Sequence, residues 1–129
     1  MVKKPEISIV MNCHNGERFL VEAIKSVLNQ TYKKWELIFW NNSSKDSSEK
    51  IFKSFKDKRL RYFYTPKKVS LYISRNAAVN KARGKFIAFL DVDDIWLPNK
   101  LKLQLKKFKD TKVGLVYGKF IKYNKNSLF

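Results

Sequence analysis

The feature that most constrains the fold is the uncharged run from Phe86 to Leu90, which ends in the carboxylates of Asp91, Asp93 and Asp94. A short apolar run of this kind predicts a strand buried on both faces, with the acids at its carboxyl end. In an open α/β sheet, ligands bind at that end of the strands. The run therefore favours a sheet with a ligand site beside these acids.

The spacing of the acids allows two interpretations. Alternate side chains of a strand share a face, which would place Asp91 and Asp93 on one side, roughly 6 to 7 Å apart at the backbone. Two such carboxylates suit a divalent cation that keeps its waters and takes phosphate oxygens from a nucleotide. In the other interpretation, Asp91 caps a turn, Asp94 caps the next helix, and no metal is bound.

The rest of the chain alternates short apolar runs with segments of helical periodicity. We expect strands at residues 6–11, 35–40, 60–65, 86–90 and 113–117, and helices at 19–28, 46–55, 74–82 and 98–108. Strands joined by helical crossovers form a mostly parallel, Rossmann-like α/β sheet with helices on both faces. At 129 residues the chain is expected to form a single domain, residues 1–129.

Polar turns follow the first two expected strands, at 12–15 and 41–43. Carboxyl ends of parallel strands meet at one edge, so these turns should gather with Arg75 and the acids at 91–94 in one cleft. The sequence contains no glycine-rich P-loop and no Gly-x-Gly-x-x-Gly, which argues against a nucleoside-triphosphatase and against a dinucleotide oxidoreductase. The pattern indicates a phosphate-bearing ligand held by a metal and one arginine.

The net charge of +17 has three competing explanations. It could mark nucleic-acid binding, attraction to anionic lipid head groups, or lysines spread over solvated faces. The densest lysine cluster, 100–109, has the pattern of the solvent-exposed side of an amphipathic helix. Of the three explanations for the charge, solvated faces therefore rank first, a membrane surface second and nucleic acid last. The sequence has one cysteine and shows no signal peptide or membrane-spanning segment, so we expect a cytoplasmic protein. Peripheral contact with the inner face of the membrane is a further possibility at this point.

Several short motifs occur together in a specific order and spacing. With them, the chain resembles the family 2 glycosyltransferases of GT-A fold over residues 7–123, and the likeness rests on residues 9–15 (IVMNCHN), 26–32 (SVLNQTY), 74–77 (SRNA), 82–94 (ARGKFIAFLDVDD) and 96–98 (WLP). The resemblance implies an inverting, metal-dependent glycosyltransferase that transfers a sugar from a nucleoside-diphosphate sugar, with a UDP-sugar ranked first. The implied acceptor is a glycan or a lipid-linked sugar.

The resemblance also implies roles for individual residues. Asp91, Val92 and Asp93 match the family's DXD motif, in which Asp93 binds Mn²⁺ or Mg²⁺ directly and Asp91 contacts the metal site, the ribose and the sugar. Arg75 matches an arginine near the nucleotide, and a guanidinium can hold phosphate oxygens with its planar fork. The turn that borders the base and ribose corresponds to Asn12, His14, Asn15 and Glu17.

The chain departs from the family pattern at three places. Asn41 and Asn42 replace a usual aspartate pair, and Asn42 would face the uracil. Ser70 and Tyr72 stand where glycine and serine are common. The family's general base lies in a later segment, so the acceptor-side half is expected to be absent and the chain to bind donor without transferring sugar.

Two alternatives remain at this stage. One is a nucleotide-binding module without transfer activity, which donor turnover would distinguish. The other is a basic nucleic-acid-binding domain, which would show steep salt dependence and no need for Mn²⁺. Apolar residues toward the end of the sequence also suggest association, including a homo-oligomer, or partial disorder near 121–129.

Overall fold

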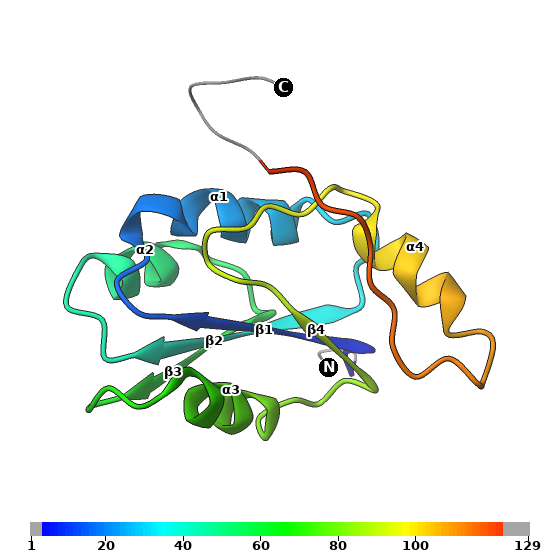
Figure 1. The fold of residues 1–129 in the computed structure, drawn as a ribbon. Helices are drawn as coiled ribbons and strands as arrows, with labels where there is room; N and C mark the ends of the chain where they lie inside the picture. Colours follow the sequence, from blue (N-terminus) through cyan, green and yellow to red (C-terminus); the bar gives the residue numbers. More distant parts are fainter. Residues whose placement is uncertain (1–3, 123–129) are drawn as a thin grey trace.

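The computed structural model describes residues 4–122, which form a four-stranded sheet in the order β3-β2-β1-β4 (Figure 1). All three neighbouring pairs are parallel, and β1 and β2 stay in register from Ile7 opposite Trp35 to Cys13 opposite Asn41. The expected α/β class is confirmed. The elements in chain order are β1 (Ile7–Cys13), α1 (Glu17–Leu28), β2 (Trp35–Asn42), α2 (Ser48–Ser54), β3 (Leu60–Thr65), α3 (Leu71–Val79), β4 (Phe86–Phe89) and α4 (Lys100–Lys107).

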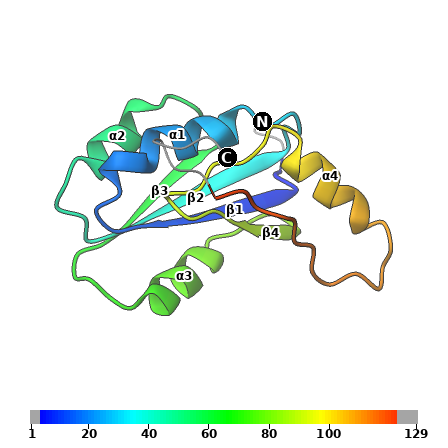
Figure 2. The ribbon, with the colours of Figure 1, turned by 45° about the horizontal axis from the view of Figure 1, so that its top comes forward.

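Helices cover both faces of the sheet, with α1 and α2 on one face and α3 on the other (Figures 1 and 2). The two central strands explain this arrangement, because their successive side chains point to opposite faces and both faces carry apolar side chains. On β1, Ile9 and Met11 join the larger core beneath α1, whereas Val10 packs with Ile38 and Ala78 on the α3 side. The central strands are therefore buried from both sides.

β4 is an edge strand in the described part of the chain, so the expectation that it is buried on both faces is wrong. Its side chains alternate: Phe86 and Ala88 pack against the core, while Ile87 and Phe89 are 38% and 52% exposed. A short apolar run does not distinguish a central strand from an edge strand. The strand expected at 113–117 is also wrong, since residues 113–122 form no regular element.

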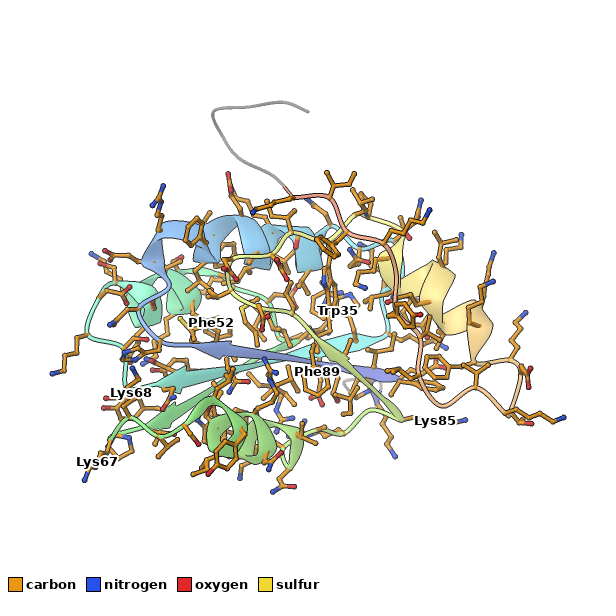
Figure 3. The ribbon with its side chains drawn as sticks, viewed as in Figure 1. Trp35, Phe52, Lys67, Lys68, Lys85 and Phe89 are labelled. Atoms are coloured by element: carbon orange, nitrogen blue, oxygen red, sulfur yellow. The ribbon has the colours of Figure 1, made fainter. Side chains whose placement is uncertain are left out.

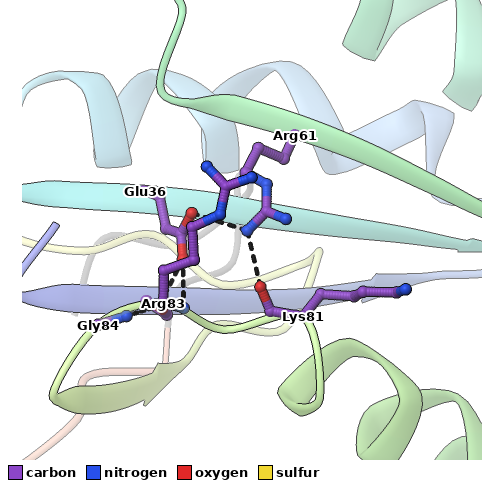
Figure 4. Close-up of polar contacts among 6 residues, drawn as sticks. Glu36, Arg61, Lys81, Arg83 and Gly84 are labelled. Carbon is purple, nitrogen blue, oxygen red and sulfur yellow. Dashed lines mark hydrogen bonds and ion pairs between the residues drawn. The ribbon is translucent and has the colours of Figure 1, made fainter. Parts of the chain in front are cut away.

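A buried polar network joins the strands near their amino ends (Figure 4). The carboxylate of Glu36 accepts hydrogen bonds from Ser8 Oγ at 2.7 Å, the Arg83 backbone N–H at 2.8 Å and Arg61 Nη1 at 2.8 Å. A buried carboxylate is tolerated when such donors surround it. The network ties β1, β2 and β3 to the loop that leads into β4.

The part of the chain that the structure describes contains no helix long and apolar enough to cross a membrane. Association or disorder was also expected near residues 121–129. Of these, residues 123–129 lie outside the described part of the chain.

Candidate functional site

The polar turns after β1 and β2 are bonded to each other at the carboxyl edge of the sheet. His14 Nδ1 lies 2.8 Å from the carbonyl oxygen of Asn42, and the Asn15 backbone N–H donates to Ser44 Oγ at 2.9 Å. In return, Asn15 Oδ1 accepts from the Lys45 backbone N–H at 2.8 Å. Asn15 adopts a left-handed backbone with φ of 54°, which asparagine tolerates well. These bonds fix the two turns in one arrangement.

The acids after β4 lie on a turn, which corrects the strand geometry expected for them. The strand ends at Phe89, and the Asp94 backbone N–H donates to the Asp91 carbonyl oxygen at 3.0 Å. Asp91 and Asp93 therefore do not share a strand face. Asp94 is not a helix cap either, because the N-cap position of α4 is Asn99. All three carboxylates belong to exposed residues of one short turn, with Val92 between Asp91 and Asp93.

Arg75 and Gly16 connect this third turn to the rest of the edge. Arg75 Nη2 from α3 pairs with Asp91 Oδ1 at 3.0 Å, and its guanidinium carbon lies 5.4 Å from the centre of the Phe89 ring. Gly16 packs so closely that a Cβ there would lie 2.7 Å from Val92 Cγ2. The structure thus brings the turns at 12–16 and 91–94 together with Arg75, as the sequence predicted for the cleft.

Three polar side-chain atoms at this edge, on the half-buried residues Asn12 and Arg75, are shielded from solvent and have no partner among the described residues. Both amide atoms of Asn12 are shielded from solvent and make no hydrogen bond, and the same holds for Arg75 Nε. Side-chain alternation along β1 puts Asn12 on the same side of the sheet as Val10 and α3, the helix that carries Arg75. A buried polar atom without a partner costs about 1 to 3 kcal/mol, which a bound polar ligand could recover.

Two other candidate residues already have protein partners. Asn42 is buried, and its amide both accepts from the Val69 backbone N–H at 3.0 Å and donates to the Val69 carbonyl at 2.8 Å. Glu17 Oε2 accepts from the Ser47 backbone N–H at 2.8 Å, while the Glu17 N–H donates to Asp46 Oδ2 at 2.9 Å. Both residues lie at the expected edge, where each holds one loop against another.

The carboxylates at 91–94 repel one another. Burial, followed by the negative charges of Asp93 and Asp91, raises the pKa of Asp94 above its usual value. A divalent cation with oxygen ligands would relieve this repulsion, so the donor set fits Mg²⁺ or Mn²⁺. Residues 4–122 contain no converging group of three or more histidine, cysteine or acidic side chains, so water and ligand oxygens would have to complete the coordination.

Sequence analysis missed several residues that shape this edge. Lys67 and Lys68 follow β3 and lie at the same end of the sheet, away from Lys85 (Figure 3). Ser44 and Ser48 hold the first turn through their hydroxyl groups, the latter accepting from the Gly16 N–H at 2.9 Å. The high serine and asparagine content of residues 41–48 is the sequence feature that could have indicated this bonding.

Comparison with known proteins gives a consistent result over most of the chain. The family model for Glycosyl transferase family 2 matches residues 8–129. The UDP-Glc:alpha-D-GlcNAc-diphosphoundecaprenol beta-1,3-glucosyltransferase WfgD of Escherichia coli is 36% identical over 122 residues, which are 95% of this chain and 48% of that protein. The uncharacterized glycosyltransferase MJ1057 of Methanocaldococcus jannaschii is 39% identical over 132 residues, which cover 97% of this chain and 46% of that protein. The chain spans about half the length of these two relatives.

Solved structures share the fold. TarS of S. aureus (residues 1–349), solved with UDP, superposes with a TM-score of 0.76 at 23% identity, over 81% of this chain and 32% of that one. The mannosyltransferase PcManGT of Pyrobaculum calidifontis, solved with GDP-Man and Mn²⁺, superposes with a TM-score of 0.78 at 19% identity. The match covers 88% of this chain and 35% of that one. At these identities the likeness concerns the fold alone.

Proposed function

This chain belongs to glycosyl transferase family 2, and we propose that it binds a nucleoside-diphosphate sugar at the carboxyl edge of its sheet for transfer of the sugar to an acceptor. The observation that supports this most directly is the set of shielded, unpartnered polar atoms on Asn12 and Arg75, beside an exposed carboxylate turn. Neutral and cationic donors next to acids suit a ligand with both hydroxyl and phosphate groups.

We assign the ligand's parts to the three turns. Arg75 would exchange its pairing with Asp91 for phosphate oxygens, since a guanidinium binds both groups in the same planar way. The exposed His14 and Asn15 would border the base and ribose, with Asn12 beneath them. Lys67 and Lys68 add positive charge at the same edge.

The metal would be held by Asp93, with Asp91 as second contact. A divalent cation at this position supplies charge neutralisation of the diphosphate leaving group. Because the Asp91 carboxylate also pairs with Arg75, release of that pair on ligand binding would free an oxygen for the ribose or the cation.

For the acceptor, we propose a glycan or a lipid-linked sugar, with inversion at the anomeric carbon. The E. coli relative is named for α-D-GlcNAc-diphosphoundecaprenol, which supports a lipid-linked acceptor for this chain as well. Inversion needs a base within hydrogen-bond reach of the acceptor hydroxyl. Asp91 and Asp93 are assigned to the metal in this proposal, and Glu17 and Asp46 bond to neighbouring loops, so none of these four is assigned as that base. Asp94 has no assigned role.

Calorimetry with UDP, with and without Mn²⁺, tests the proposal. We expect UDP binding that strengthens when Mn²⁺ is present, and we expect Asp93→Ala to abolish the metal-dependent part while the unfolding midpoint stays unchanged. The reason is that Asp93 is exposed and has no protein partner among the described residues whose loss would weaken the fold.

Asp110→Ala is the control, because it removes another exposed carboxylate, from the turn after α4, where Asp110 Oδ1 accepts only from the Lys112 backbone N–H at 2.9 Å. It should leave Mn²⁺-dependent binding within twofold of the parent. Metal-dependent binding that survives in Asp93→Ala, or that both variants lose equally, would refute the assignment.

A further inference from the structure

A second surface, at the opposite end of the sheet from the proposed donor site, has the character of an anion site. A groove of about 310 Å³ lies between α4 and the start of β4, and its lining consists of Glu6, Lys85, Phe86, Lys102, Leu105, Lys106, Phe108 and Lys109. Lys85 stands six residues before Asp91, roughly 20 Å away along an extended chain. The groove therefore belongs to a different region from the carboxylate turn.

The groove has a net positive charge, because four lysines and only one acid line it. Its four lysines are all exposed, and none of them forms an ion pair within residues 4–122. The single acid, Glu6, already accepts a hydrogen bond from the Tyr32 hydroxyl. Four like charges around one depression repel one another, and a bound anion would remove that repulsion.

The floor of the groove is apolar. The rings of Phe86 and Phe108 pack with centroids 4.7 Å apart, and Leu105 lies against the same core. Leu103, next to Lys102 on α4, is 58% exposed. Cations above an apolar floor, with a further apolar side chain beside them, suit an amphiphile whose head group is anionic better than they suit a free ion.

The groove is preformed, because buried Gln30 fixes the start of α4 against the end of α1. Its amide nitrogen donates to the Leu97 carbonyl at 2.8 Å, and its amide oxygen accepts from the Leu101 N–H at 3.1 Å. The lysines on successive turns of α4 are thus presented on a fixed helix rather than on a loop.

We propose that this lysine groove binds the phosphate head group of an anionic membrane lipid, so that α4 lies against the membrane surface. The inference does not rest on the proposed donor site. Each lysine close to an anionic surface strengthens binding by about fivefold, so two of them account for about 25-fold in affinity.

Vesicle co-sedimentation of the whole 129-residue chain without nucleotide tests the proposal. The vesicles contain either equal parts of phosphatidylglycerol and phosphatidylcholine, or phosphatidylcholine alone. We expect binding to the former only, weakened about 25-fold by the double variant Lys102→Gln/Lys106→Gln. The control double variant Lys50→Gln/Lys56→Gln removes the same charge from exposed positions in and just after α2, and it should change binding less than threefold.

Three outcomes would overturn the proposal: no binding to phosphatidylglycerol, equal weakening by both double variants, or release of the protein from vesicles by millimolar inorganic phosphate. The second would mean that net charge alone attracts the chain, and the third that the groove holds a free anion. UDP binding by Lys102→Gln/Lys106→Gln should remain unchanged, which separates this proposal from the donor site.

Discussion

At the scale of single residues, Asn42 shows how the structure changes what a substitution is expected to do. The family resemblance implied that Asn42 faces the uracil, but in the structure its amide forms a closed pair of hydrogen bonds with the Val69 backbone. A carboxylate has no hydrogen to donate, so Asn42→Asp would leave the Val69 carbonyl facing a negative charge. We expect a loss of about 1 to 3 kcal/mol in the free energy of unfolding at pH 7, measured with urea.

The pH dependence of Asn42→Asp provides its internal control. Below about pH 4 the new carboxyl becomes protonated and can donate again, so the stability difference from the parent protein should shrink. A variant as stable as the parent at pH 7, or one whose deficit is the same at low pH, would show that the bonds to Val69 contribute little.

The sequence predicted which residues lie at the carboxyl edge of the sheet, but it did not predict their hydrogen-bond partners. Polar turns after parallel strands predicted that His14, Asn15 and the acids gather at one edge. In the structure His14 and Asn15 bond to the turn after β2, and Gly16 packs against Val92 of the acid turn. The partners of Asn42 and Glu17 were not predictable, because they depend on backbone groups of other loops. A sequence pattern does not record which carbonyl a side chain reaches.

At the scale of secondary-structure elements, Gly84 controls how β4 joins the sheet. A Cβ at this position would lie 2.7 Å from the Ser8 backbone nitrogen and 2.8 Å from the Ile7 carbonyl carbon, and neither backbone atom can move independently. We expect Gly84→Ala to lower the free energy of unfolding by about 1 to 3 kcal/mol, as overpacking commonly does.

Gly114→Ala is the matched control in the same denaturation experiment. A Cβ there meets nothing within 4 Å, and no glycine of the described residues has a positive φ. Its effect should stay within about 0.5 kcal/mol of zero. Equal effects of the two alanine substitutions would contradict close packing of Gly84 against β1.

The first turns of α1 and α2 stabilise each other through Asp46. Asp46 and Glu49 have the spacing of a capping box in the sequence. In the structure, however, the N-cap of α2 is Ser47, and Asp46 accepts from the N–H groups of Glu17 and Ser48. Although burial alone would raise it, the pKa of Asp46 lies below its usual value because of bonds from the Ser48 hydroxyl and these N–H groups.

A lowered native pKa means that Asp46 contributes stability above the pKa of the unfolded chain and loses that contribution as the pH falls through the native value. We therefore expect Asp46→Asn to cost about 1 kcal/mol at pH 7 and progressively less under more acidic conditions. Urea unfolding at several pH values measures this. A deficit independent of pH would mean that the charge of Asp46 is not what stabilises the helix ends.

At the scale of the whole molecule, the sequence predicted the fold class correctly, but it did not predict which strand lies at the edge of the sheet. Central strands such as β2 carry apolar side chains on both faces, and this pattern is sufficient to identify them. The run at 86–90 looks the same in sequence, yet within residues 4–122 β4 pairs with one strand only and has an exposed face. Position within a sheet depends on pairing between distant segments, which local patterns do not contain.

The most direct test of the central claim is a map of backbone amide chemical shifts on addition of UDP and Mg²⁺. Binding at the carboxyl edge predicts that the largest changes fall at residues 12–16, 41–44 and 91–94 and at Arg75, with little change along α4. Largest changes in α4 and around Lys85, or none at the three turns at saturating UDP, would contradict a donor site at this edge.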